Sequence, residues 1–143
     1  MLPPQNIVDT AVANKFDSLV NAVKKFPDLV SALSEGGPYT VFAPTDAAFQ
    51  DIANVVNDLS KDQLKKVLQY HVVKKNIVSF TMKQGSETTL TNQDVRVDFL
   101  WRWGMNGWYW GAKVNDAYIN TFDVLASNGI IHVIDQVLIP PNF

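Results

Sequence analysis

Apolar residues recur at helical spacing in four stretches of the first half of the chain, with polar residues between them. Each stretch predicts an amphipathic helix with one buried face. The cap candidates are Asp28 for the second helix, Thr45 or Asp46 for the third, and the capping box Ser60-Lys61-Asp62-Gln63 for the fourth. Gly36-Gly37-Pro38 ends the second helix. The four stretches are Phe16-Leu19-Val20-Val23, Leu29-Val30-Leu33, Phe49-Ile52-Ala53-Val56 and Leu64-Val67-Leu68-His71.

The other segments show the spacing of strands. Residues 39–43 are rich in β-branched and aromatic side chains, and Pro44 is predicted to end their pairing because it cannot donate a ladder hydrogen bond. From Ile77 onward the pattern alternates, in runs separated by Gly or Asn. Residues 130–134 and 137–139 carry apolar side chains on both faces, which indicates a strand covered on both sides. Helices followed by strands favour the α+β class. The alternating runs are Thr88-Leu90, Val95-Val97-Phe99 and Ala112-Val114.

All four tryptophans lie within residues 99–110, and the same segment contains Asn106-Gly107. Asn-Gly is the strongest two-residue signal for a hairpin turn, because both central residues of a type I′ turn need a positive φ. Counting outward from this turn, the predicted register sets Met105 opposite Trp108, Trp103 opposite Trp110, Trp101 opposite Ala112, and Phe99 opposite Val114. One face of the hairpin would then carry Phe99, Trp101, Trp103, Met105, Trp108, Trp110, Ala112 and Val114.

Two interpretations of this tryptophan face stay open. The face can pack on the core, with a cross-strand Trp103-Trp110 pair adding to its stability. Alternatively, part of it is exposed, because each aromatic ring buries about 150–250 Å² and a hairpin tip in a small domain offers little cover for four rings. An exposed remainder of this kind marks a binding surface, an oligomer contact or a membrane-facing patch.

Composition and charge narrow the class of protein. We expect residues 1–143 to form a single domain. With 47% hydrophobic residues and a formal charge of -2, the chain has the composition of an ordinary globular protein and lacks the basic face that nucleic acid requires. It has no cysteine, no run of about 18 apolar residues that would span a membrane, and no secretory signal in its first residues. The protein is therefore either cytosolic or, as we prefer, a mature domain with an added Met1.

The chain shows no catalytic or metal-binding pattern. Its only histidines, His71 and His132, lie far apart in sequence, without acidic or histidine companions at ligand spacing. A histidine between Ile131 and Val133 is predicted to be a core residue whose ring nitrogens pair with backbone groups. Asp46 and Asp135 have the positions of cap and turn carboxylates. We therefore expect no enzyme, no catalytic residues and no metal.

Three motifs cover nearly the whole chain in a recognisable order. They are Thr40-Val41-Phe42-Ala43-Pro44-Thr45-Asp46-Ala47-Ala48-Phe49, then Tyr70-His71-Val72-Val73, then Asn128-Gly129-Ile130-Ile131-His132-Val133-Ile134-Asp135. Together they resemble the two signature boxes and the tyrosine-histidine motif of the fasciclin domain. The resemblance implies an α+β fold with helices packed against a twisted β-sandwich or wedge. It also implies a binding module that is secreted, displayed at the cell surface or periplasmic.

The resemblance also assigns expected site residues. In animal fasciclin domains, the tyrosine-histidine motif and an Asp-Ile pair before the second box are linked to integrin binding. Here they correspond to Tyr70-His71 and to Asp123-Val124, where valine replaces isoleucine. The implied function is adhesion to a cell-surface or matrix protein, without a cofactor.

The alternative function is carriage of an elongated apolar molecule. Some algal members of the family bind carotenoids, and the hairpin offers a flat apolar contact. A carotenoid-like pigment would then contact Trp101, Trp103, Met105, Trp108 and Trp110. The identity of the partner or ligand and the oligomeric state stay open.

Overall fold

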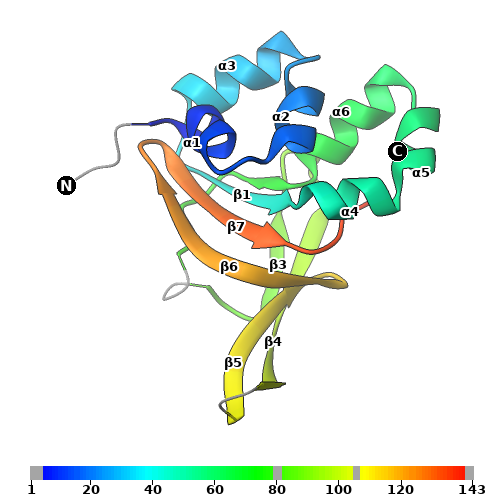
Figure 1. Ribbon diagram of the computed structural model, residues 1–143. Coiled ribbons are helices and arrows are strands. Elements are labelled where there is room, and N and C mark those ends of the chain that lie inside the picture. Colours follow the sequence, from blue (N-terminus) through cyan, green and yellow to red (C-terminus); the bar gives the residue numbers. More distant parts are fainter. Residues whose placement is uncertain (1–4, 79–81, 105–106, 141–143) are drawn as a thin grey trace.

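Figure 1 shows the computed structural model, which describes residues 5–78, 82–104 and 107–140. Within these residues, six short helices lie on one side of a seven-stranded sheet, which confirms the α+β class. The helices are α1 (Ile7–Ala13), α2 (Asp17–Val23), α3 (Pro27–Glu35), α4 (Asp46–Asp51), α5 (Ala53–Asp58) and α6 (Lys61–Gln69). The strands are β1 (Tyr39–Pro44), β2 (Val72–Val73), β3 (Gly85–Thr88), β4 (Asp94–Gly104), β5 (Gly107–Val114), β6 (Ala117–Ala126) and β7 (Gly129–Ile134).

The sheet bends until its two edges almost meet. Its strand order is β2-β1-β7-β6-β5-β4-β3, and β1 with β7 is the parallel pair among antiparallel neighbours. A bridge between Val73 at the end of β2 and Thr89 just after β3 joins the outer edges. The result is a nearly closed wedge, whose two sides carry separate apolar clusters.

The central strands β1 and β7 face both clusters. In β1, Val41 and Ala43 point to the helical side, while Phe42 belongs to the cluster inside the wedge. In β7, Ile131 points to the helices and Ile134 to the inside. Apolar residues on both faces therefore mark a covered strand, as predicted for residues 130–134. Residues 137–139 do not continue this pattern as a strand, and that prediction is wrong, although Val137 and Leu138 are buried.

Two helices begin with the N-terminal caps that the sequence predicts. Ser60 and Gln63 form the predicted capping box of α6, with both reciprocal hydrogen bonds present. Thr45 caps α4, since its hydroxyl accepts from the Ala48 N–H. The segment from Phe49 to Val56 is interrupted at Ile52, where α4 ends and α5 begins, and Ala53 is exposed, contrary to the prediction.

Two carboxylates near helix starts act differently from the prediction. Asp28 does not cap α3, because Pro27 already occupies the first turn; Asp28 instead pairs with Lys65 of α6, and this hydrogen bond lowers the pKa of its carboxyl. Asp46 caps a neighbouring helix: its Oδ1 accepts from the Ser18 N–H at 2.9 Å. It supplies the cap that Phe16, at the N-cap position of α2, cannot provide.

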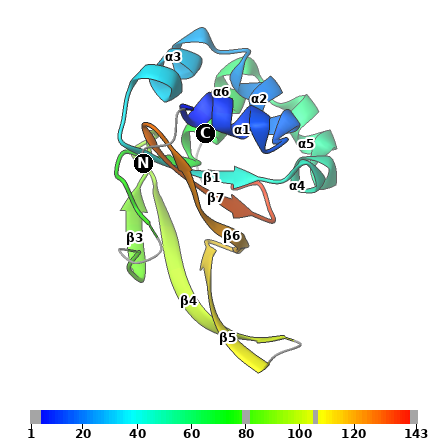
Figure 2. The ribbon, with the colours of Figure 1, turned by 60° about the vertical axis from the view of Figure 1, so that its left-hand side comes forward.

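The hairpin of β4 and β5 extends well beyond the rest of the sheet, away from the helices, as Figure 2 shows. Its base is part of the interior cluster, through Val95, Val97, Ala112 and Val114. The hairpin therefore carries its apolar face from the core out into solvent.

Candidate functional site

Tyr70 is a buried structural residue at the end of α6. The residue is 2% exposed. Its hydroxyl donates to the Asp94 carbonyl at 2.8 Å and accepts from Asn115 Nδ2 at 3.0 Å. The ring thus links α6 to the start of β4 and to the turn after β5, and it is covered from solvent.

His71 is buried beside Tyr70, just after α6, and its tautomer follows from its partners. Leu138 N–H donates to Nε2 at 2.8 Å, so Nε2 is the acceptor and Nδ1 carries the proton that is donated to the Val67 carbonyl at 2.7 Å. Burial lowers the pKa of His71 to about 4. The ring is therefore neutral at pH 7, and both of its nitrogens are engaged.

His132 has the core role that its sequence context predicts. Asp123 N–H donates to Nδ1 at 3.1 Å, so Nε2 carries the proton and donates to the Ile77 carbonyl at 2.7 Å. Phe42 stacks on the ring, and Phe122 meets it edge-on. Burial lowers the pKa of His132 as well. The imidazole holds β7 against β6 and against the segment before β3.

Asp123 and Val124 lie at an irregularity of β6. The register with β7 shifts between Thr121 and Val124, and Asp123 has φ +60°. This bulge turns the Asp123 N–H toward His132. Val124 is partly buried against the helical cluster, whereas Leu125 is 54% exposed.

The two halves of the expected adhesion site are not neighbours in the sheet. Tyr70 and His71 precede β2 at one edge, and Asp123-Val124 lies in β6, beyond β1 and β7. The side chains of Tyr70 and His71 are also buried. Only Asp123-Val124 and the adjacent Leu125 reach a surface from which a partner can be contacted.

The two signature boxes lie side by side at the centre of the sheet. Their strands β1 and β7 pair in parallel from Tyr39 opposite Gly129 to Pro44 opposite Ile134. Asp135 closes this region as a turn carboxylate, because it accepts from the Tyr118 N–H at 2.8 Å and donates its own N–H to the Tyr118 carbonyl. These boxes are scaffold.

Asn128 has a larger structural role than its turn position indicates. Its Oδ1 accepts from the Ile7 N–H at 2.9 Å, and its Nδ2 donates to the Leu33 and Gly36 carbonyls at 2.7 and 2.8 Å. One side chain thus provides hydrogen-bond partners for a backbone N–H at the start of α1 and for two backbone carbonyls at the end of α3. Gly129 beside it lies so close to β1 that a Cβ would be 2.2 Å from the Tyr39 carbonyl oxygen.

The observed hairpin register differs from the predicted one by two residues. Trp103 opposes Trp108, Trp101 opposes Trp110 and Phe99 opposes Ala112. The last pair of the ladder is Gly104 with Gly107, so Gly107 is a strand residue; Met105 and Asn106 lie outside the described residues. The physical reason is that this register sets tryptophan opposite tryptophan at two positions, where the predicted one does so once.

The tryptophan face is exposed at its outer end. Trp101 and Trp103 are 68% and 69% exposed, whereas Phe99 is partly buried against the interior cluster. The side chains of Met105, Trp108 and Trp110 fall outside the described part of the structure. The shift of two residues keeps Phe99, Trp101 and Trp103 together on one face, as predicted, because side chains alternate with a period of two.

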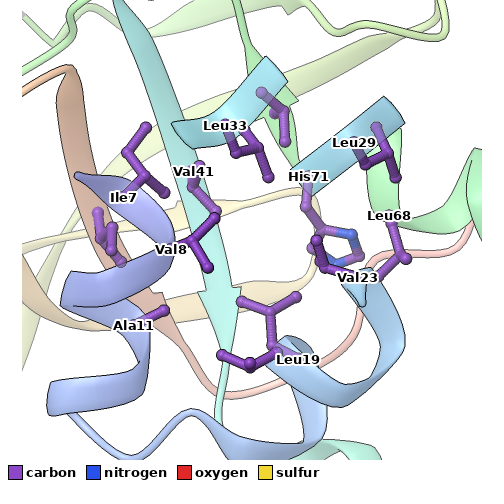
Figure 3. Close-up of a pocket in the computed structure, with 13 residues that line it drawn as sticks. Ile7, Val8, Ala11, Leu19, Val23, Leu29, Leu33, Val41, Leu68 and His71 are labelled. Carbon is purple, nitrogen blue, oxygen red and sulfur yellow. The ribbon is translucent and has the colours of Figure 1, made fainter. Parts of the chain in front are cut away.

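A small apolar cavity lies between the helices and the sheet. Figure 3 shows Leu19, Leu29, Leu33 and His71 among the side chains around it. Its volume is about 30 Å³, and its walls are apolar apart from His71, whose ring nitrogens are already paired. An apolar cavity of this size stays dry and is too small for an elongated ligand.

The described residues hold no group of three or more His, Asp or Glu side chains that could bind a metal ion. Within the same residues, every buried polar side-chain atom has a hydrogen-bond partner. No helix in the described part of the chain is long and apolar enough to cross a membrane.

Known proteins with similar sequences span several kingdoms. A model of the fasciclin domain matches residues 14–140. The chain is 44% identical to protein sll1483 of Synechocystis sp., in an alignment that covers 94% of this chain and 73% of that protein. It is 35% identical to the cell surface glycolipoprotein MPB83 of Mycobacterium bovis, covering 96% of this chain and 62% of that protein. It is 32% identical to the transforming growth factor-beta-induced protein ig-h3 of Oryctolagus cuniculus, of which it covers 20%.

A solved structure shares the fold. It is a FAS1 domain pair from the insect cell adhesion molecule fasciclin I, with a TM-score of 0.62 and 20% sequence identity. The match covers 94% of this chain and 47% of that one.

Proposed function

Because the chain belongs to the fasciclin domain family, we propose that it acts by binding a cell-surface or matrix protein, outside the cell or at its surface, and that it does not catalyse a reaction. Two similar proteins carry matching descriptions, a cell surface glycolipoprotein and a cell adhesion molecule. Residues 1–143 would act as one domain.

The adhesion surface that we propose is the exposed end of β6. Its apolar contact is Leu125, 54% exposed, at the rim of a hollow of about 560 Å³. The hollow is also lined by Glu35 from the end of α3 and by Ser127 from the next turn. Asp123 and Val124 lie beside Leu125 in the same strand. Tyr70 and His71 support this surface only through the fold, because their side chains are buried.

Cell attachment to the immobilised protein tests this surface. Asp123→Asn removes the charge but tolerates the left-handed backbone, and Leu125→Ser removes the apolar contact. We expect either change to reduce attachment of integrin-bearing cells about fivefold or more, as for an anchor residue. The matched control is Val55→Ser on α5, where valine is 48% exposed. Equal attachment by all three variants would show that β6 is not the contact surface, and no attachment by the wild type would contradict the adhesion function.

We infer a second candidate function, carriage of a carotenoid-like pigment, from the exposure of Trp101 and Trp103. Side chains on one face of a strand repeat about every 7 Å, so Phe99, Trp101 and Trp103 form an apolar track about 13–14 Å long. Met105, Trp108 and Trp110 would complete this contact. The internal cavity of about 30 Å³ offers no alternative place for such a ligand.

Visible absorption checks the pigment function. After mixing with a carotenoid and gel filtration, the wild type is expected to retain colour, while Trp101→Ser with Trp103→Ser loses most of it because the two exposed anchors are gone. Leu125→Ser is the control and should stay coloured. A colourless wild type under these conditions would rule out the carrier function.

A further inference from the structure

Glu35 ends α3 with a charge that opposes the helix. The carbonyl groups at a helix C-terminus carry a partial negative charge, so a cation there stabilises the helix and a carboxylate destabilises it. The last turn of α3 contains no basic residue, and no ion pair of the described residues involves Glu35. Residues that work against their own element are concentrated at functional sites. The charge of Glu35 therefore contributes nothing to the stability of α3.

Two backbone carbonyls at the same helix end lack their usual partners. The Ser34 carbonyl would accept from residue 38, which is proline and has no N–H. The Glu35 carbonyl would accept from the Tyr39 N–H, which donates instead to the Asn128 carbonyl at 3.2 Å. No other hydrogen bond to these two carbonyls occurs within the described residues. The end of α3 thus offers two carbonyl acceptors next to a carboxylate.

This helix end borders the hollow beside β6. Figures 1 and 2 both show the end of α3 beside the turn between β6 and β7. Glu35 is the one charged side chain among the described residues that line the hollow, whereas Pro38, Val78 and the exposed Leu125 make part of its wall apolar. Its volume of about 560 Å³ is in the range of ligand pockets and admits a long side chain with part of its backbone. The hollow therefore combines an apolar wall with a negative one.

We propose that this hollow receives a lysine or arginine side chain of the partner protein. Such a side chain joins an aliphatic stem to a cationic head, and it lays the stem on apolar surface while the head stays among polar groups. The stem would lie against Leu125, and the head would donate to the Glu35 carboxylate and to the carbonyls at the end of α3. The inference rests on the adhesion function proposed above and gives the chemistry of the partner at that surface.

The lysines that precede Asn76 do not neutralise this hollow. Lys74 and Lys75 line a separate hollow, together with residues 86–90 and Asn92. The Lys75 ammonium pairs there with Glu87 at 3.0 Å. Among the described residues, Glu35 is thus left without an ion-pair partner, and a cation from another protein can take that place.

Glu35→Gln tests the carboxylate in the cell-attachment assay. The change removes the charge and keeps the shape, so the coating concentration for half-maximal attachment should rise about tenfold, as for loss of a charged hydrogen bond. The urea midpoint should stay the same or rise, because the charge no longer opposes α3. Asp58→Asn is the matched control, since it removes an exposed carboxylate at the end of α5, outside the hollow, and should attach cells like the wild type.

A small probe tests the hollow without cells. In NMR titrations of the isotope-labelled full chain, N-acetyl-arginine amide should shift the amide signals of Gly36, Ser127 and Asn128 in a saturable way. N-acetyl-citrulline amide has nearly the same shape without the charge, so it should bind about tenfold more weakly. Glu35→Gln should bind the two probes equally.

The two assays separate this inference from the adhesion function. Equal attachment by wild type and Glu35→Gln would overturn the basic anchor and leave the adhesion function standing. No saturable shift with the arginine probe, or equal binding of both probes by the wild type, would also overturn it. A wild type that attaches no cells but binds the arginine probe through Glu35 would contradict the adhesion function and support the site for a basic side chain.

Discussion

Gly129→Ala is expected to lower the free energy of unfolding by about 3 kcal/mol or more, at the upper end of what overpacking costs. The added Cβ would lie 2.2 Å from the Tyr39 carbonyl oxygen and 2.7 Å from Ile7 Cδ1. Tyr39 is the register partner of Gly129 in the parallel pair of β1 and β7, so the clash forces the two central strands apart. The same movement strains the hydrogen bond from the Ile7 N–H to Asn128.

Urea unfolding measures this effect. The midpoint should fall while the slope of the transition stays nearly the same, because unfolding of the variant exposes nearly the same surface area. Ser127→Ala is the matched control, since it changes an exposed residue in the same turn and should shift the free energy by less than about 0.5 kcal/mol. A Gly129→Ala midpoint close to that of the control would mean that β1 and β7 are farther apart than described.

Local signals predicted the elements whose contacts are local. The capping box at Ser60 and Gln63 and the cap at Thr45 follow from hydrogen bonds three residues apart. Helix α1 was not predicted, because its buried face is only Ile7, Thr10 and Ala11, too short and too polar to show a helical period. Strand β6 was not predicted either, since its bulge at Asp123 breaks the alternation.

The pattern of polar and apolar residues did not predict hydrogen bonds between residues far apart in the sequence. Asn128 has the sequence of a turn residue, yet its amide joins α1 and α3, which are more than 90 residues away along the chain. Asp46 caps α2 across 28 residues. The sequence separation between each of these side chains and its partner follows no regular pattern, so the contacts can be recognised only in the folded structure.

For the hairpin, the sequence predicted the faces of the strands correctly but not their register. The face of each hairpin residue depends on alternation alone, and the structure keeps every described residue on its predicted face. The register depends on where the turn begins, and a shift of two residues leaves the face pattern unchanged. The core role of His132 was clear from Ile131 and Val133 on either side.

Acid is expected to destabilise the protein through its two buried histidines. Burial lowers the pKa of His71 from 6.5 to about 4 and also lowers the pKa of His132. The unfolded chain then binds protons at a higher pH than the folded one, so the stabilisation is complete above pH 6.5 and is lost as the pH falls. For His71 the loss amounts to about 3 kcal/mol down to pH 4. The structural reason is shared: each ring accepts a backbone N–H on one nitrogen, which must be given up when that nitrogen is protonated.

The pH dependence of urea unfolding distinguishes the two histidines. Between about pH 6 and 5, where most carboxylates stay ionised, His71 alone should give a slope approaching about 1.4 kcal/mol per pH unit, and His132 should add to this slope in the same direction. His71→Gln removes the His71 contribution, so it should be less stable at pH 7 yet lose stability with a clearly smaller slope, and His132→Gln should lower the slope as well. A wild-type slope near zero over this interval would mean that both rings are accessible to protons in the folded protein. An unchanged slope in His71→Gln would mean that another group carries the acid response.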